Sequence, residues 1–416
     1  MDAADILPKG FACPHCGKSA GFTKEEDTLD GWFDSGSTHF AAMKKDQGFW
    51  PATMYLEGLD QYRGWFQSSL LTAVGAFGEG APFKECVTHG WTVDGEGRAM
   101  HKSLGNGVDP ADIFNENGAD ILRLWAASAD YHADVRCSKA IFQQLSQNYL
   151  KFRNTCKFML DNLVDFDPAH LTKAEDMPVL DRWLITKLNE LIEKVEQSYN
   201  DYEFHIITHA VNDFCVTTLS SFYLDIVKDR LYCEAADSAE RRSAQTALYL
   251  TLSTLAKLFA PILAFTCDEI WLAMPHTAED DARNVVLNDM NKPFTAYALD
   301  AETMARWEHI IEVRTAVNGA LEEARASKVI GKSLEADVHL TVPEGDVFLA
   351  DENPAALADL FIVSKVELTV GGELAVKVEN AAGTKCPRCW KHSLTPNAEG
   401  LCPRCAEVVR HLPDLL

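Results

Sequence analysis

The sequence TMYLEGLDQYRGWFQSSLLTAVG, at residues 53–75, predicts a β-strand followed closely by an α-helix. The apolar run at residues 54–56 forms the strand, and a helical pattern starts at Tyr62. Polar side chains gather between the two elements, namely Glu57, Asp60, Gln61 and Arg63. In open α/β sheets, ligands bind at the carboxyl ends of strands, so these groups can hold an amino group, a ribose or a phosphate. A solvated acidic turn would explain Asp60 but not the density of polar groups.

Two neighbouring stretches extend this α/β pattern. Upstream, DTLDGWFDSGSTH at residues 27–39 predicts a strand that turns into a loop, with Trp32 and Phe33 as a large apolar wall. On residue chemistry alone, this is a buried aromatic pair beside a turn. Downstream, residues 86–91 predict a second strand that ends in His89-Gly90-Trp91.

The stretch GRAMHKSLGN, at residues 97–106, has the composition of a mobile loop. It follows the second strand and precedes a helix start with Asp109 as N-cap and Pro110 in the first turn. The ammonium of Lys102 and the hydroxyl of Ser103 would suit a phosphate, because backbone amides and a cation can converge on one anion there. A plain exposed turn remains the alternative.

Length and composition limit the possible classes of protein. The 416 residues are 47% hydrophobic, which is enough for two or three domains with their own cores. The formal net charge of −24 argues against non-specific coating of nucleic acid, although a local basic patch could still bind RNA. No apolar run approaches the length of a membrane span, and residues 1–10 lack a signal-peptide profile. We therefore expect a cytoplasmic protein without a membrane partner.

The chain becomes helical from residue 142. Apolar residues recur at three- and four-residue spacing in segments 149–163, 183–199, 204–232 and 239–274, which predicts a helical bundle with a kink at Pro261. Leu184, Leu188, Leu191 and Val195 form one expected core stripe. An acidic connector at 276–293 and a helix at 303–327 follow. Strands at 336–342 and 361–370, around a short helix at 354–360, predict a small α/β module.

The cysteines favour reduced thiols and metal sites, because six of the twelve fall in Cys-x-x-Cys pairs. The pairs Cys386/Cys389 and Cys402/Cys405 are separated by twelve residues and can close a structural four-thiolate zinc site, with redox or chance pairing as the alternative. Cys13 and Cys16 form a third pair with no second pair nearby, so either distant ligands complete a site or the turn holds no metal.

Cations and an aromatic ring accompany the terminal cysteine pairs. They are Arg388, Lys391, Arg404 and Trp390. This combination suits an RNA backbone and one unstacked base.

Several long motifs together resemble the isoleucyl-tRNA synthetases. They are WFDSGS at 32–37, YLEGLDQYRGWFQSSL at 55–70, HGWTVD at 89–94, DYHADVR at 130–136, FYLDIVKDRLY at 222–232 and the CPRCW…CPRC pairs. The resemblance covers essentially the whole chain. Valyl- and leucyl-tRNA synthetases share the architecture, but the WFDSGS form and the terminal cysteine pairs favour the isoleucine enzymes.

The resemblance implies an α/β and α fold. It comprises a partial Rossmann-type class I catalytic domain, an α-helical anticodon-binding bundle, a small α/β module and C-terminal zinc knuckles. The expected domains are the end of a connective insertion with half a zinc knuckle (1–26), the C-terminal half of the catalytic domain (27–141), the anticodon-binding domain (142–300), the tRNA-contacting module (301–383) and the zinc-binding domain (384–416).

The resemblance also assigns site residues. Glu57 matches the residue that contacts the aminoacyl-adenylate, with Gly58, Asp60 and Gln61 beside it. Trp65 and Trp32 would line the pocket for the amino-acid side chain, and His89 and Gly90 would lie near the nucleotide. The loop at 97–106 aligns with the KMSKS signature, although Ala99 replaces its first Lys and His101 its first Ser. Lys102 and Ser103 keep the second pair, and Lys102 would neutralise charge that develops on the α-phosphate.

The function implied is that of an isoleucine–tRNA ligase, which activates isoleucine with ATP and transfers it to tRNA(Ile). ATP would act as a substrate with Mg²⁺, and one structural Zn²⁺ would be bound. The HIGH signature and the editing domain of the family are not found, so we expect catalysis to need the missing N-terminal half and this chain alone to be inactive. It would be either a truncated gene product or half of a split enzyme. Cys13 and Cys16 fit this, because their partners in the family come from the inserted region. The alternatives are a non-catalytic tRNA-binding module, a zinc-stabilised scaffold or a relative of the valyl enzyme.

Overall fold

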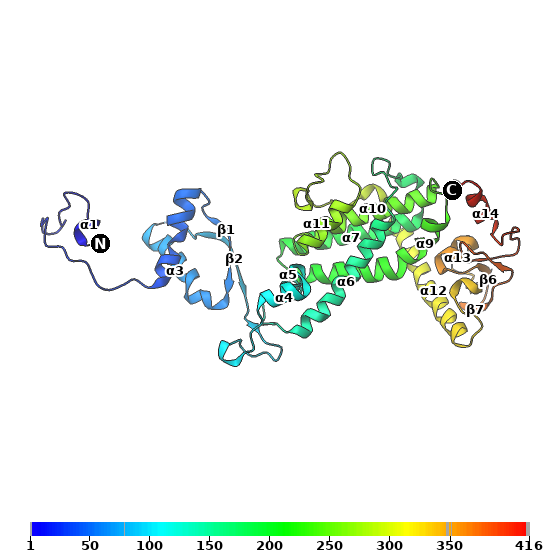
Figure 1. Ribbon diagram of the computed structural model, residues 1–416, viewed down its shortest axis with the longest axis horizontal. Helices are drawn as coiled ribbons and strands as arrows, with labels where there is room; N and C mark the ends of the chain where they lie inside the picture. Colours follow the sequence, from blue (N-terminus) through cyan, green and yellow to red (C-terminus); the bar gives the residue numbers. More distant parts are fainter. Residues whose placement is uncertain (1, 79, 347–348, 351, 413–416) are drawn as a thin grey trace. The chain divides into compact units, whose positions relative to one another are not determined.

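The computed structural model describes residues 2–78, 80–346, 349–350 and 352–412. It contains two compact units: the first comprises Met1–Gly107 and Tyr131–Cys137, and the second Val108–Asp130 and Ser138–Leu416 (Figure 1). Four of the expected domains include residues outside the described ones, namely 1, 79, 347–348, 351 and 413–416. No helix in the described ranges is both long and apolar enough to cross a membrane.

The first unit contains two small parallel sheets and short helical segments. The helical segments are α1 (Ala3–Ile6), α2 (Gly31–Gly36), the π-helical η1 (His39–Gln47), the 3-10 turn η2 (Leu59–Arg63), α3 (Trp65–Leu71), the π-helical η3 (Thr72–Ala76) and the 3-10 turn η4 (Lys102–Leu104). The strands are β1 (Ala52–Gly58), β2 (Phe83–His89), β3 (Thr92–Val93) and β4 (Val135–Arg136). β1 pairs with β2 and β3 with β4, both in parallel, and α3 supplies the crossover that parallel β1 and β2 require.

The predicted strand and helix of residues 53–75 are confirmed as β1 and α3. The helix begins at Trp65 rather than Tyr62, because η2 makes a tighter turn first. Tyr55 of β1 is buried and stacks on Trp65, with ring centroids 4.3 Å apart, and its hydroxyl lies 3.0 Å from Ser69 Oγ. These contacts hold α3 on one face of β1.

The strand predicted within residues 27–39 is wrong, because this stretch contains the helix α2. The Asp30 carboxylate accepts a hydrogen bond from the Trp32 N–H at 2.8 Å, which caps the helix start. Gly36 then allows α2 to contact α3, since a Cβ at Gly36 would lie 2.6 Å from Ser68 Cβ. The cap and this contact outweigh the preference of adjacent aromatic residues for strands.

The second unit is dominated by a helical bundle. Its helices are α4 (Pro110–Asn117), α5 (Ala119–Ser128), α6 (Lys139–Asp161), α7 (Val179–Asn200), α8 (Phe204–Asp213), the π-helical η6 (Phe214–Tyr223), α9 (Leu224–Cys233), α10 (Ala239–Phe259), α11 (Ala264–Ala273) and α12 (Ala301–Ala326). Short 3-10 turns lie at Ala174–Asp176, Val285–Leu287, Thr295–Tyr297 and Ser333–Glu335. α10 packs against α6, α7, α9 and α11 (Figure 1).

The bundle confirms the helical periodicity and corrects two details. All four residues of the predicted stripe on α7 are buried: Leu184, Leu188, Leu191 and Val195. The single helix expected over 204–232 is α8, η6 and α9 in succession. The kink expected at Pro261 is a complete break between α10 and α11, because proline lacks the N–H that a continuing helix needs.

The small α/β module follows the bundle. It has a three-stranded sheet in the order β6-β5-β7, formed by β5 (Ala336–Val342), β6 (Lys365–Val370) and β7 (Ala375–Asn380), together with α13 (Pro354–Phe361). β6 starts four residues later than the predicted strand because Phe361 belongs to α13, and β7 was not predicted. The chain then forms the hairpin β8 (Thr384–Lys385) and β9 (His392–Ser393) and the helix α14 (Pro403–Arg410).

Candidate active site and metal centre

The parallel pairing of β1 and β2 brings four predicted site residues to one sheet edge. In the register of the two strands, Glu57 lies opposite Thr88 and Gly58 opposite His89, so Gly90 follows at the same edge. Gly58 lies close to two polar groups, because a Cβ there would be 2.8 Å from Asp60 Oδ1 and 3.6 Å from His89 Cε1. The side chain of Glu57 is exposed. These four residues therefore lie at the carboxyl ends of two adjacent parallel strands.

Asp60 and Gln61 are oriented by their neighbours. Gln61 Nε2 donates to Asp60 Oδ2 at 3.0 Å, and Gln61 Oε1 accepts from the Trp65 N–H at 3.0 Å. The amide side chain thus links the acidic turn to the first turn of α3. Both side chains are thus oriented by hydrogen bonds within the protein.

The two predicted pocket tryptophans both lie beside Gly64, Trp65 as the next residue and Trp32 from α2. Trp65 is held by its stacking on Tyr55 and by a hydrogen bond from its indole N–H to the Ser35 carbonyl at 3.0 Å. The ring of Trp32 approaches Gly64, where a Cβ would lie 3.2 Å from Trp32 Cζ2. Trp32 remains 43% exposed, so its side chain is partly accessible to a ligand.

Gly90 is required for close packing against the segment at residues 130–136. A Cβ at Gly90 would overlap the Ala133 carbonyl, and the Gly90 N–H donates to the Tyr131 carbonyl at 2.9 Å. The next amide, of Trp91, donates to Asp134 Oδ1 at 2.8 Å. These contacts explain why two motifs far apart in the sequence, HGWTVD and DYHADVR, occur together.

Asp94 holds the loop that carries Lys102. Its side chain is buried and accepts hydrogen bonds at 2.9–3.0 Å from Asn106 Nδ2, the backbone N–H groups of Arg98 and Glu96, and Arg98 Nε. Asn106 Oδ1 also accepts from the His101 N–H, which joins the middle of the loop to its end. These hydrogen bonds, from Asn106 above all, hold the pKa of Asp94 well below its usual range. Our sequence reasoning missed Asp94 and Asn106, although they end the motif and the loop that it singled out.

Lys102 and Ser103 lie on the exposed turn η4. Gly105 closes this turn with φ of +59°, in the left-handed region that favours glycine. Within the described ranges, neither side chain makes a hydrogen bond or ion pair, including any to the β1–β2 edge. Among the described residues, the Lys102 ammonium therefore makes no ion pair, and it lies on a loop that Asp94 holds in place. The structure shows no contact between Lys102 and Glu57.

The four terminal cysteines converge as predicted. The Sγ atoms of Cys386, Cys389, Cys402 and Cys405 all lie within 4.8 Å of one another, and those of Cys389 and Cys402 are 3.8 Å apart. Tetrahedral zinc with Zn–S bonds near 2.3 Å requires sulfur atoms about 3.8 Å apart, so the residues fit the metal. Cys13 and Cys16 belong to no comparable cluster among the described residues.

The surroundings of Cys386 favour a thiolate. Burial raises the pKa of this thiol, but hydrogen bonds from the backbone amides of Cys389, Cys402 and Arg388 outweigh it and lower the pKa to about 6. A zinc-ligating cysteine must be deprotonated.

The cations expected beside RNA have partners within the protein. Arg404 pairs with Asp229, Lys391 pairs with Asp359, and the Arg388 guanidinium donates to the carbonyls of Cys233 and Tyr232. Trp390 remains 54% exposed, and Lys332 Nζ lies 5.6 Å from the centre of its ring.

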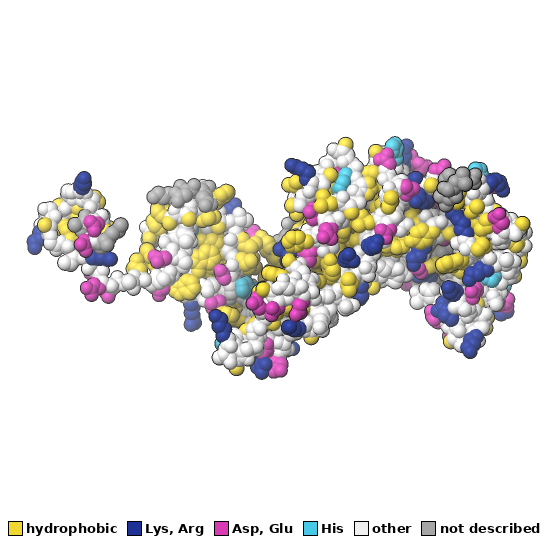
Figure 2. Space-filling view, in the orientation of Figure 1, with side chains coloured by type: hydrophobic (Ala, Val, Ile, Leu, Met, Phe, Trp, Pro, Cys, Tyr) yellow, Lys and Arg dark blue, Asp and Glu magenta, His cyan; other side chains and the backbone are white. Residues whose placement is uncertain are grey.

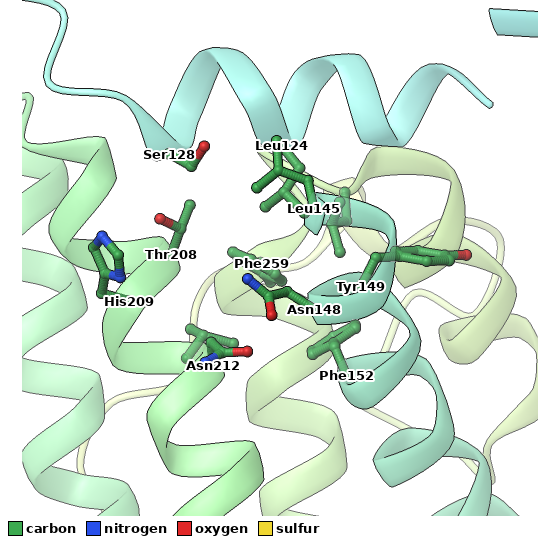
Figure 3. Close-up of a pocket in the computed structure, with 12 residues that line it drawn as sticks. Leu124, Ser128, Leu145, Asn148, Tyr149, Phe152, Thr208, His209, Asn212 and Phe259 are labelled. Atoms are coloured by element: carbon green, nitrogen blue, oxygen red, sulfur yellow. The ribbon is translucent and has the colours of Figure 1, made fainter. Parts of the chain in front are cut away.

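A small cavity of about 80 Å³ opens inside the bundle between α5, α6, α8 and α10 (Figure 3). Its walls are mostly apolar, and the amides of Asn148 and Asn212 point into it (Figure 3). The volume suits a few water molecules rather than an amino acid or a nucleotide. None of the predicted site residues lines it.

Known proteins match this chain over almost its entire length. The family described as class I tRNA synthetases (I, L, M and V) matches residues 5–138, and the anticodon-binding domain of tRNA ligases matches residues 181–340. The isoleucine–tRNA ligase of Moorella thermoacetica is 47% identical over 99% of this chain and 46% of its own length, and that of Desulforamulus reducens is 48% identical over 98% and 46%. These relatives are enzymes. The chain thus spans about half the length of the curated relatives that it matches.

The fold also matches a solved synthetase. A leucyl-tRNA synthetase from Agrobacterium radiobacter K84, in a ternary complex with tRNA and LeuAMS, superposes with a TM-score of 0.55 at 17% identity, over 89% of this chain and 38% of that one. At this identity the match supports the fold alone.

Proposed function

This chain belongs to the class I tRNA synthetases, and on that premise we propose that it supplies part of the aminoacyl-adenylate site of an isoleucine–tRNA ligase. The observation that carries the proposal is the β1–β2 register, in which Glu57 lies opposite Thr88 and Gly58 opposite His89 at one edge of the sheet. The near 47% identity to isoleucine–tRNA ligases supports isoleucine rather than valine as the substrate.

In this function the residues at the strand edge bind and orient substrate. The Glu57 carboxylate holds the amino group of isoleucine, Asp60 and Gln61 flank it, and Trp65 and Trp32 line the side-chain pocket. His89 and Gly90 lie against the nucleotide. Lys102 on its loop neutralises charge on the α-phosphate as the isoleucine carboxylate attacks, and Ser103 donates to the same phosphate. ATP brings Mg²⁺ as part of the substrate, while zinc on the four cysteines is structural.

We propose further that catalysis requires the part of the isoleucine–tRNA ligase relatives that this chain does not match. Parallel sheets are normally covered on both faces, yet the sheet here has two strands and its Leu56 is 54% exposed. Apolar side chains gather on the visible surface of this unit (Figure 2). Leu59, Tyr62, Leu71 and Val74 are among the exposed apolar residues of the same unit.

Isoleucine-dependent ATP–pyrophosphate exchange tests this function. We expect negligible exchange by the purified chain, and restored exchange when the unmatched N-terminal part of the Moorella thermoacetica relative is added. In that mixture, Lys102→Ala should lower exchange by about 100-fold, the usual cost of removing one group that stabilises transition-state charge. Lys173→Ala, an exposed lysine of the second unit, is the matched control. Equal exchange by the two variants would exclude Lys102 from the mechanism.

We also propose that the second unit binds tRNA(Ile), in the cytoplasm. A cavity of about 550 Å³ between α9, α13 and the four-cysteine module is lined by the aromatic rings of Trp390 and Tyr232, which can stack on an unpaired base. Trp390→Ala should weaken binding of labelled tRNA(Ile) about tenfold, whereas Leu394→Ala, exposed in the same module, should not. Tight tRNA binding with no exchange from any N-terminal partner would instead favour a non-catalytic tRNA-binding module.

A further inference from the structure

Helix α9 connects the bundle to the four-cysteine module through two adjacent residues. Arg230 donates to the carboxylate of Asp181 at 2.9 and 3.0 Å, and Asp181 is fully buried and also accepts from Tyr223 and Ser243. Asp229 pairs with Arg404 on α14. One turn of α9 is thus fixed in the bundle and also contacts the module.

The contact with Arg404 has the geometry of a strong ion pair. Arg404 Nη1 lies 2.5 Å from Asp229 Oδ2 and 2.8 Å from Glu234 Oε1, and Nη2 lies 2.8 Å from Asp229 Oδ1. The three side chains are only 34%, 23% and 19% exposed. A two-pronged, partly buried pair of this kind is stronger and more directional than an exposed one.

Apolar packing completes the joint. Cys233, at the end of α9, is buried in one cluster with Cys386, Cys389, Leu401 and Cys405. Cys233 lies outside the four-sulfur cluster.

We propose that Arg404 is a positioning residue that docks the four-cysteine module onto α9, so that the module and the bundle form one rigid body. The charge of Arg404 is then used within the protein and does not contact RNA. This inference is independent of the proposed aminoacylation, because it concerns only how two parts of the second unit are joined.

Hydrogen–deuterium exchange of the zinc-loaded chain tests the docking. Arg404→Ala should speed exchange in α14 and in the last turn of α9 by about tenfold, as expected when a local contact opens. Arg410→Ala is the matched control, since Arg410 lies on the same helix and, among the described residues, forms an ion pair only with the exposed Glu407. The charge-swapped double variant, Arg404→Asp with Asp229→Arg, should restore protection of α14 and of the last turn of α9 against hydrogen exchange. Zinc content should stay at one per chain, which shows that the module itself remains folded.

Three results would overturn the proposal. The first is an unchanged rate of hydrogen–deuterium exchange in α9 of the Arg404→Ala variant. The second is failure of the charge-swapped double variant to restore protection. The third concerns the slope of the logarithm of the tRNA-binding constant against the logarithm of salt concentration. If Arg404→Ala reduces the magnitude of this slope by about one, Arg404 neutralises a phosphate. If Arg404→Ala loses zinc, Arg404→Lys serves instead. It keeps the charge but loses the second contact to Asp229, so partial protection supports docking and full protection contradicts it.

Discussion

Asp94 is the single residue on which the order of the Lys102 loop depends most. Its carboxylate accepts from two backbone amides and two side chains, and no other described group of the loop does so. Asp94→Asn removes the charge and places an amide where an acceptor is needed. We expect the N–H groups of Glu96 and Arg98 to exchange about tenfold faster in this variant. Asp109→Asn, at an exposed helix cap where asparagine serves equally well, is the control.

The same carboxylate makes the loop sensitive to acid. The pKa of Asp94 is lower in the folded chain than in an unfolded chain, where it is about 3.9. The ionised Asp94 carboxylate therefore contributes fully to the stability of the folded loop above about pH 4. This stabilisation is lost as the pH falls through the pKa of Asp94 in the folded chain. Exchange measured from neutral pH downward should show loop protection that persists below about pH 4 in the native chain. Loss of protection near neutral pH would contradict this assignment.

Among the elements, α7, α9 and α10 are joined by one buried carboxylate. Asp181 of α7 binds Arg230 of α9 and Ser243 of α10, and its own side chain is fully buried. Asp181→Ala leaves the buried guanidinium without its partner, so we expect the free energy of unfolding to fall by about 3–5 kcal/mol. Asp161→Ala removes an exposed pair with Lys157 and should cost less than about 1 kcal/mol. Urea unfolding of both variants checks this, and equal losses would refute it.

Elements whose structure depends on residues close together in the sequence were predictable from the sequence. β1, β5, α4 with its Asp109 cap and the buried stripe of α7 follow from spacing and cap chemistry alone. The polar groups at the end of β1 were predictable for the same reason, since they lie within a few residues of one another. The helix α2 was not, because its packing depends on Gly36 meeting Ser68 across the fold. The partners of Arg404, Asp229 and Glu234, likewise lie far away in the sequence and are brought to it only by folding.

At the scale of the whole molecule, the metal should stabilise one part of the chain only. The four cysteines lie with Leu401 and with Cys233 at the end of α9 in a small cluster, distinct from the large core of the bundle and the three-stranded sheet. Cys405→Ser should lose zinc and expose residues 384–412 to exchange, while α7 and α10 stay protected. Metal analysis and exchange on one sample test this. Loss of protection in α10 would show that the metal stabilises the bundle as well.

The two units differ most in how much apolar surface each buries. In the described part of the first unit, the buried apolar side chains are Tyr55, Phe66, Ala73, Val93 and Cys137, whereas the second unit has a continuous core. Stability follows buried apolar area, so the first unit should unfold at lower urea concentration, in a transition separate from that of the second.

A polypeptide that covers β1 and β2 should raise the urea midpoint of the first transition and leave that of the second unchanged, because binding stabilises only the unit that it contacts. Fluorescence of Trp32 and Trp65, with the other tryptophans replaced by Phe, reports the first transition. One common transition, unmoved by the N-terminal part of the Moorella thermoacetica relative, would show that the exposed sheet is not a surface for that partner.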